Sequence, residues 1–250
     1  MKLYLDISPQ PDDTTCGPTC LHAIYRYFDD PIHLSRVISE VTDLEGGGTL
    51  AVYLACHALR RGYKATIYTY NLKLFDPTWF VPNGPDISEK LRLQLRHKDD
   101  DSLFKTATHA YLKFFELGGK LRFQALTPGL IRKYLKREVP ILTGLNATYL
   151  YNCSREYVEG LHLVHDDIRG ESTGHFVVLA GYDKMSRNVL IADPLKPNPV
   201  SSHQQYEVNI YRLVCSIMLG IVTYDDNLLI IEPRMRRKAK GERNAQFVPE

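Results

Sequence analysis

The stretch QPDDTTCGPTC, residues 10–20, constrains the fold more than any other part of the 250-residue chain. The apolar residues of the following CGPTCLHAIYRYF recur at helical spacing and predict an amphipathic helix that begins at Cys16. Thr14 and Thr15 are suitable N-caps, and Pro18 is tolerated in a first turn. Two interpretations of the paired cysteines follow: a metal or disulfide pair, or a nucleophile at a helix N-terminus.

A cysteine nucleophile reacts as a thiolate, which a helix N-terminus and a nearby imidazolium both favour. Cys16 stands where the unpaired backbone N–H groups of the helix would point at its sulfur. Gln10 precedes it on an extended segment, from which a side-chain amide can reach back as an oxyanion donor. Cys20 lies one turn further in, and we expect it to be a packed small residue. A zinc half-site is the alternative, but no second Cys/His pair with the usual zinc spacing completes it.

A cysteine nucleophile needs a base, and His175 is the candidate among nine histidines. It opens the apolar strand HFVVLAGY, where a polar ring must find partners. The alternative is a hydrogen-bonded core histidine. The next strand ends in VLIADP, which makes Asp193 the candidate to orient the base. If the hairpin places position 195 opposite His175, Asp193 lies two residues away on the same face. The alternative is a turn residue before Pro194.

Hydrophobic periodicity elsewhere predicts helices mainly in the first half of the chain and strands mainly in the second. This segregation indicates an α+β fold rather than alternating βαβ units. Besides the first helix, we expect helices at 31–44, 49–62, 87–98, 102–117, 127–139 and 206–219, and strands at 64–75, 120–126, 140–151, 174–183, 188–193 and 227–233. Residues 76–86 and 152–173 are expected to be loops.

The length and the 44% hydrophobic content allow one sizeable core, and we expect a single domain over residues 1–233. Insertions are expected near 76–120 and 152–174. Residues 234–250, RMRRKAKGERNAQFVPE, lack apolar periodicity and predict a basic, flexible tail. An acidic partner could bind this tail.

The formal net charge of only +2 gives no electrostatic reason to expect nucleic acid as a partner. No apolar run approaches the roughly 20 residues of a membrane-spanning helix, and the N-terminus lacks a signal-peptide pattern. Five scattered cysteines are a poor disulfide framework. We therefore expect a cytoplasmic protein without a cofactor. The cluster HLVHDD, with His162 and His165, could bind a metal, but a solvated loop is the simpler interpretation.

QPDDTTCGPTCL, GHFVVLAGYD and VLIADP together resemble the three motif blocks of the papain-like double-glycine leader peptidases and their stand-alone relatives. The segments EGGGTLAVYLACHALRRGYKATI and VPILTGL are also similar to parts of that family. The resemblance implies a papain-like fold, in which a helical lobe packs against an antiparallel sheet. It further implies that Gln10 is the oxyanion donor, Cys16 the nucleophile, His175 the base and Asp193 its orienter.

The expected activity is that of a cysteine hydrolase, specifically a peptidase, which cleaves a peptide or protein substrate through a thioester acyl-enzyme. An acyl transferase would use the same site with an amine in place of water. A non-catalytic peptide-binding module of the same fold is the third interpretation. The chain carries no transporter or ATPase region, and its insertions exceed those of a minimal domain.

Overall fold

A seven-stranded sheet forms the centre of the computed structural model, which describes residues 1–45, 47–98, 102–160, 162–224 and 226–234. In chain order its strands are β1 (Tyr63–Thr69), β2 (Lys120–Arg122), β3 (Ile141–Asn146), β6 (Gly174–Asp183), β7 (Asn188–Ala192), β8 (Gln205–Asn209) and β9 (Asn227–Pro233). They lie side by side in the order β2-β1-β9-β3-β6-β7-β8, and only β1 and β2 run parallel. The expectation of a mostly antiparallel sheet is confirmed.

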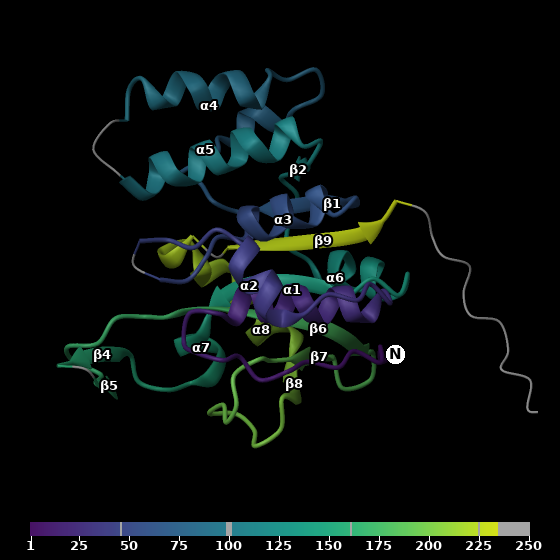
Figure 1. Ribbon diagram of the computed structural model, residues 1–250, viewed down its shortest axis with the longest axis vertical. Coiled ribbons are helices and arrows are strands. Elements are labelled where there is room, and N and C mark those ends of the chain that lie inside the picture. The colour runs from purple at the N-terminus through teal and green to yellow at the C-terminus, as the bar shows by residue number, and fades with distance from the viewer. Residues whose placement is uncertain (46, 99–101, 161, 225, 235–250) are drawn as a thin grey trace, which may run out of the picture.

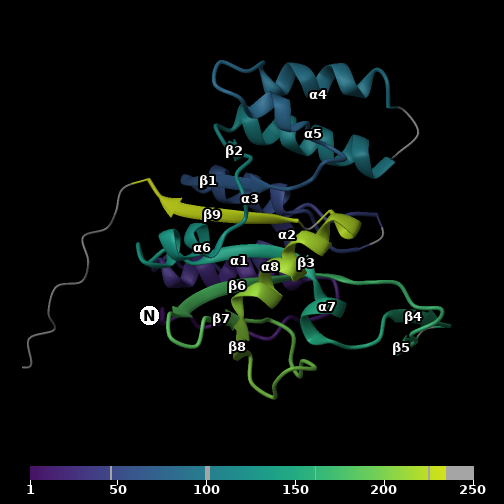
Figure 2. The same ribbon diagram turned by 180° about the vertical axis from the view of Figure 1, so that it is seen from behind.

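Helices cover both faces of this sheet (Figures 1 and 2). One face carries α1 (Cys16–Tyr27), α2 (Leu34–Glu40) and α3 (Ala51–Arg60), and the other carries α6 (Pro128–Leu135), α7 (Ala147–Tyr151) and α8 (Ile210–Leu219). The short helix η1 (Pro77–Phe80), α4 (Ile87–Leu95) and α5 (Ser102–Glu116) follow β1 and lie beyond α3, and η2 (Gly220–Thr223) follows α8. No described helix is both long and apolar enough to cross a membrane.

Strand β6 is buried on both faces, which explains its unbroken apolar sequence. Phe176 and Val178 join the core beneath α1 and α3, whereas Val177 and Leu179 join the core beneath α6 and α8. Successive residues of a strand point to opposite faces, so each of these cores takes every second side chain. This double burial fixes the register of the strand that begins with Gly174 and His175.

Two predicted elements were wrong in the same way. The strand predicted over 140–151 ends at Asn146, whose side chain accepts a hydrogen bond from the Tyr149 amide and caps α7. The helix predicted over 206–219 begins only after Asn209, which caps α8 in the same manner. In both places an asparagine ends a strand and starts a helix, because its short side chain satisfies a free N–H group of the first turn.

Two further elements differ from the predictions. The strand predicted over 64–75 ends at Thr69, because the Asn71 side chain accepts from the amides of Lys73 and Leu74 and forms a turn. The loop expected over 152–173 contains a two-stranded hairpin, β4 (Glu156–Glu159) with β5 (His162–His165), which projects from the body (Figure 1). The predicted tail lies outside the described residues after Arg234.

The N-terminal segment is tied to the sheet by hydrogen bonds spaced along its length. The Leu3 amide donates to Ala180 in β6, the Leu5 carbonyl accepts from the Gln205 side chain, and the Gln10 amide donates to Pro194. Pro194 follows the end of β7 by two residues. The segment therefore delivers Gln10 to the end of the sheet where β6 begins and β7 ends.

Gly17 packs where no side chain fits. A Cβ atom there would lie 2.7 Å from Thr49 Cγ2 and 3.2 Å from atoms of both Leu54 and Phe176. Glycine at this position therefore allows the first turn of α1 to approach α3 and β6 closely.

We expect Gly17→Ala to lower the free energy of unfolding by about 1–2 kcal/mol, because overpacking outweighs the helix-propensity gain of about 1 kcal/mol. Gly129→Ala in α6 is the matched control, since its Cβ would meet nothing nearer than Thr127 Oγ1 at 3.5 Å. Urea unfolding should show the control unchanged or stabilised. Thr49→Ser removes the clashing methyl group and should restore stability to Gly17→Ala; a loss that persists in the double variant would refute this account.

Candidate active site

Asp193 is fully buried, yet every oxygen of its carboxylate is satisfied. Oδ1 accepts from His175 Nε2 at 2.8 Å and from the Leu195 amide at 2.9 Å. Oδ2 accepts from the hydroxyl groups of Tyr151 at 2.8 Å and Tyr206 at 2.6 Å. Four donors to one carboxylate indicate that it is ionised, because a protonated acid would lose part of this acceptor capacity.

The electrostatics of the pair follow from this arrangement. Burial opposes the charged form of each group, but the mutual attraction and hydrogen bond between Asp193 and His175 prevail. They hold the pKa of Asp193 below its usual value, with help from Tyr206 and the Leu195 amide. Together with a hydrogen bond to Cys16 and its charge, they raise the pKa of His175 to about 10. At neutral pH the site therefore holds an imidazolium against a carboxylate.

The register of the β6–β7 hairpin is the one expected from the sequence. Val178 pairs with Ala192 and Leu179 with Ile191, so continuation of this register would set position 195 opposite His175. Asp193 is then the diagonal neighbour on the same face, as predicted, and the 2.8 Å hydrogen bond joins the two side chains.

Cys16 is the first residue of α1 and is 9% exposed. Its sulfur lies close enough to the imidazole ring to contribute to the raised pKa of His175, and since Nε2 is hydrogen-bonded to Asp193, Nδ1 is the ring nitrogen left for the sulfur. Thr15 occupies the N-cap position but its hydroxyl does not cap the helix; it donates to the Asp12 carbonyl instead. The first-turn N–H groups of α1 are thus left for the sulfur or for a bound anion.

Gln10 lies beside Cys16, His175 and Asp193, and its side chain is not hydrogen-bonded to any of them. Its Nε2 donates to the Asp12 carbonyl at 2.8 Å, which uses one of the two N–H bonds of the amide. Its Oε1 is buried and has no hydrogen-bond partner among the described residues. The backbone bond to Pro194 places Gln10 next to Asp193 in space. The structure thus joins His175 to Asp193 by a hydrogen bond, sets Cys16 close enough to His175 to raise its pKa, and brings Gln10 to the same end of the sheet.

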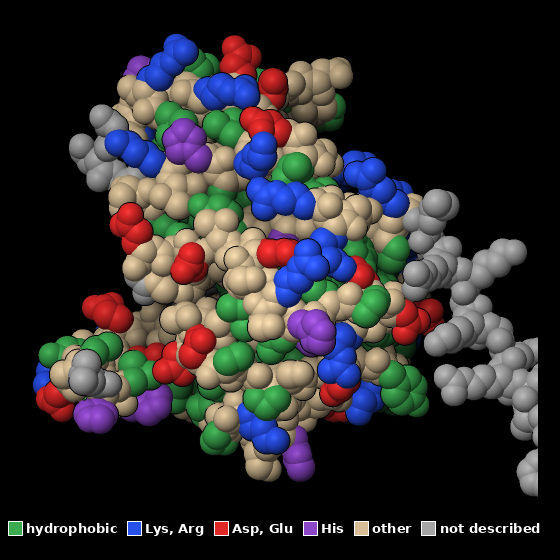
Figure 3. Space-filling view, in the orientation of Figure 1, with side chains coloured by type: hydrophobic (Ala, Val, Ile, Leu, Met, Phe, Trp, Pro, Cys, Tyr) green, Lys and Arg blue, Asp and Glu red, His purple; other side chains and the backbone are tan. Residues whose placement is uncertain are grey.

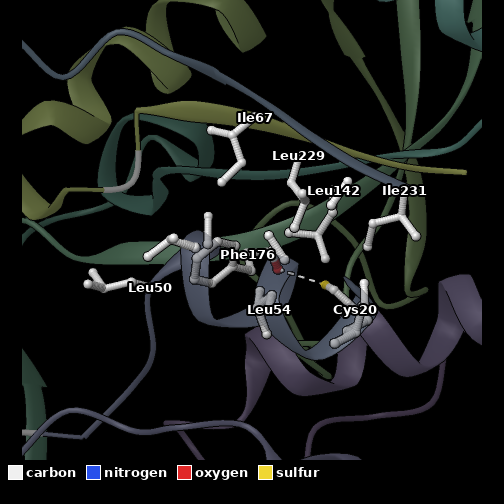
Figure 4. Packing of buried hydrophobic residues seen from close by; sticks show 14 of the residues in the cluster. Cys20, Leu50, Leu54, Ile67, Leu142, Phe176, Leu229 and Ile231 are labelled. Atoms are coloured by element: carbon white, nitrogen blue, oxygen red, sulfur yellow. Dashed lines mark hydrogen bonds between the residues drawn. The ribbon is translucent and has the colours of Figure 1, made fainter. Parts of the chain in front are cut away.

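Cys20 is fully buried, and its S–H donates to the Phe176 carbonyl at 3.2 Å (Figure 4). Burial first, and then the charges of Cys16 and Asp193, raise the pKa of this thiol well above its ordinary value. The bond links α1 to β6 one residue from His175, so Cys20 is a packing residue, as expected.

The residues of HLVHDD lie in and after the projecting hairpin, over which histidine and acidic side chains gather (Figure 3). His162 and His165 are exposed. His165 contacts the Ser154 carbonyl, and Asp166 is bonded to Arg169. Among the described residues no group of three or more His, Cys, Asp or Glu side chains is arranged to hold a metal ion.

Sequence reasoning missed Tyr151 and Tyr206. Both lie in segments whose secondary structure was mispredicted, and the chain has 16 tyrosines, so residue type alone gives no signal. Knowledge that Tyr206 lies in β8, the strand next to β7, would have placed its side chain near Asp193. No comparable local signal exists for Tyr151, which reaches the carboxylate from α7.

Residues 126–215, which contain His175 and Asp193, match the Peptidase_C39 like family. The chain is similar in structure to a protein from Bacillus anthracis described as a C39-like peptidase, with 15% identity, 94% of this chain and 100% of that chain covered, and a TM-score of 0.52. These matches confirm the resemblance to C39-like peptidases and the papain-like fold.

Two other solved structures are similar with lower scores. A double glycine motif protease from an AMS/PCAT transporter, in complex with its leader peptide, has 14% identity and a TM-score of 0.44 over 93% of this chain and 94% of that chain. Xylellain, a cysteine protease from Xylella fastidiosa, has 15% identity and a TM-score of 0.44 over 94% of this chain and 85% of that chain. No curated protein sequence matches the chain.

We expect Asp193→Asn to lower the pKa of His175 by about 1–3 pH units, because the nearby negative charge is removed while the volume is kept. The raised pKa stabilises the fold fully below the ordinary value of 6.5, and this contribution is lost as the pH rises through about 10. NMR titration of the isotope-labelled His175 ring measures its pKa in the wild-type protein and in Asp193→Asn. An unchanged midpoint in Asp193→Asn would show that Asp193 does not hold the imidazolium.

Tyr206→Phe should cost about 1.5–3 kcal/mol, because it removes a hydrogen bond to a buried charge. The lowered pKa of Asp193 contributes stability that is present above its unfolded value and lost as the pH falls through the folded value. Loss of the Tyr206 bond raises that folded pKa, so the acid-unfolding midpoint should move to higher pH. Tyr211→Phe, at an exposed ring on α8, is the control and should leave the midpoint in place. Equal midpoints in all three proteins would contradict the assignment.

Proposed function

We propose that this protein is a cysteine peptidase that cleaves a peptide or amide bond through a thioester acyl-enzyme. The observation that carries the proposal is the arrangement of three side chains: Cys16 at the start of α1 contributes to the raised pKa of His175, and His175 is hydrogen-bonded to the buried carboxylate of Asp193. The family match over residues 126–215 supports the peptidase class.

In the first half of the reaction, the Cys16 sulfur attacks the substrate carbonyl carbon and forms the C–S bond. The carbonyl electrons move to oxygen, and the Cys16 backbone N–H and the second N–H of Gln10 donate to this oxyanion. His175, already an imidazolium, gives its proton to the departing amine as the C–N bond breaks. The product is a thioester on Cys16, and the amine leaves as the first product.

In the second half, neutral His175 takes a proton from water, whose oxygen attacks the thioester carbonyl. The C–S bond then breaks, the carboxylic acid is released and Cys16 returns to its starting form. Asp193 keeps the imidazole ring oriented through both halves. Tyr151 and Tyr206 keep the carboxylate fixed and ionised, so they position the base without contacting substrate.

The proposed catalytic unit is one domain over residues 1–233. Strand β9, the last strand among the described residues, lies between β1 and β3, so residues 227–233 close a sheet that begins in the first third of the sequence. The insertions at 76–120 and 152–174 lie outside the hydrogen-bonded group, and the second leads directly into Gly174 and His175. The substrate of this domain would be a peptide or a protein.

The sharpest test is to incubate the protein with a peptide library, quench the reaction rapidly with acid and measure the intact mass of the protein. An acyl-enzyme appears as an increase in that mass. A mass adduct that maps to Cys16, and that is absent from Cys16→Ala, would support the proposal. Gln10→Ala should reduce kcat about 10²–10³-fold, as loss of one oxyanion donor does. A library that produces neither cleavage nor an adduct, while peptides still bind, would point to a non-catalytic binding module instead.

Iodoacetamide labelling provides a test that needs no substrate. We expect Cys16 to be alkylated at least about 10-fold faster than the exposed Cys215, because the imidazolium and the helix N-terminus favour negative charge on its sulfur. His175→Ala should remove this advantage, while Cys20→Ala should keep it and mainly lower stability. Peptide mapping after timed quenching gives each rate; faster labelling of Cys215 than Cys16 in the wild-type protein would refute the nucleophile assignment.

A further inference from the structure

A second site lies at the opposite end of β6 from His175. A cavity of about 500 Å³ opens between α6 and the end of β6, at the β6–β7 turn. Figure 2 shows α6 beside that end of the strand. The volume is within the range of small-molecule pockets, about 300–1,000 Å³. It is far larger than a single bound ion requires.

Helix α6 turns a basic face toward this cavity. Arg132, Lys133 and Lys136 line it together with Gly129, at the spacing that places residues on one face of a helix. The opposite face of α6, which includes Ile131 and Leu135, is buried in the core. The orientation of the cations is therefore fixed by the packing of the helix.

The side chains that line the cavity carry an excess of positive charge. Among the described residues, neither Arg132, Lys133 and Lys136 nor Lys184 on the β6–β7 turn forms an ion pair. The one carboxylate in the lining, Asp183, accepts from Met185 and Ser186 within its own turn. Composition does not explain the cluster, because the whole chain has 31 basic and 29 acidic residues.

The walls supply an apolar surface as well as charge. The Arg132 guanidinium lies 5.5 Å from the centroid of the Tyr182 ring, a geometry that holds it in place by a cation–π contact. Tyr182 is half-buried, and Met1 and Gly129 lie in the lining with it. Such a lining suits a ligand with an organic body as well as a charged end.

We propose that this cavity binds a small organic phosphate of about nucleotide size. The phosphate groups bind Arg132, Lys133 and Lys136, and the organic body fills the remaining volume against Tyr182. Four cations against one carboxylate leave an excess of positive charge that favours a ligand with more than one negative charge, and a guanidinium with neighbouring ammonium groups is a preferred donor set for phosphate oxygens. The site requires none of the residues assigned to peptide cleavage.

Isothermal titration calorimetry on the full chain tests this proposal with three probes. ADP carries both charge and an organic body, pyrophosphate carries only the charge, and adenosine carries only the body. We expect ADP to bind most tightly, pyrophosphate more weakly and adenosine not measurably. The affinity for ADP should fall as NaCl is raised from about 0.05 to 0.5 M, because salt screens exposed charges.

The double variant Arg132→Gln/Lys136→Gln should weaken ADP binding about 10- to 100-fold, since it removes two charge-assisted contacts. The matched control, Arg92→Gln/Arg96→Gln on and beside α4, changes the net charge equally and should weaken binding less than about 2-fold. Absence of saturable binding, or equal weakening by both double variants, would overturn the proposal. Equal affinities for pyrophosphate and ADP would overturn the part that assigns an organic body.

Discussion

A buried negative charge organises one end of this molecule. An unpaired carboxylate in a protein interior costs several kcal/mol, so Asp193 is tolerable only where donors surround it. Those donors come from β6, α7, β8 and the turn that follows Asp193 itself. Three segments that lie 13 to 42 residues from Asp193 in sequence must therefore converge with its own turn for the fold to keep this charge satisfied. The orientation of His175 is a consequence of that requirement, because rotation of the ring would leave Oδ1 with a single donor.

Two hydrogen bonds to backbone carbonyl groups position helix α1 and the N-terminal segment relative to Asp193 and His175. The Cys20 thiol donates to the Phe176 carbonyl and fixes α1 against β6, while the Gln10 amide donates to Pro194 and fixes the N-terminal segment against the end of β7. Neither bond uses the side chain of Cys16 or His175. The bonds that place α1 and the N-terminal segment therefore do not use the Cys16 sulfur, so a substitution at Cys16 can report on chemistry rather than on folding. A substitution at His175 also removes a donor to the buried Asp193 carboxylate.

Hydrophobic pattern was sufficient to predict β6, β7 and the place of His175 and Asp193, because a strand buried on both faces has few alternative registers. It failed at Asn146 and Asn209, since an asparagine that ends a strand and caps a helix resembles any polar strand residue. The two tyrosines of the site lie in the segments around those asparagines and were missed for that reason. The basic spacing on α6 is visible in the sequence, but the cavity also needs Tyr182, which lies some 50 residues further along the chain.

Strand β6 carries both sites, yet their charges act separately. From His175 to Tyr182 the strand rises roughly 20–25 Å, at about 3.3 Å per residue. Exposed charges are largely screened beyond about 8–10 Å at physiological ionic strength. The cations around the cavity would lower the pKa of His175 if they acted on it, but they lie too far away, and the adjacent Asp193 and Cys16 set the raised value. An influence of one site on the other would have to pass through the strand, which is buried on both faces from Phe176 to Ala180, where the pairing with β7 shifts its register.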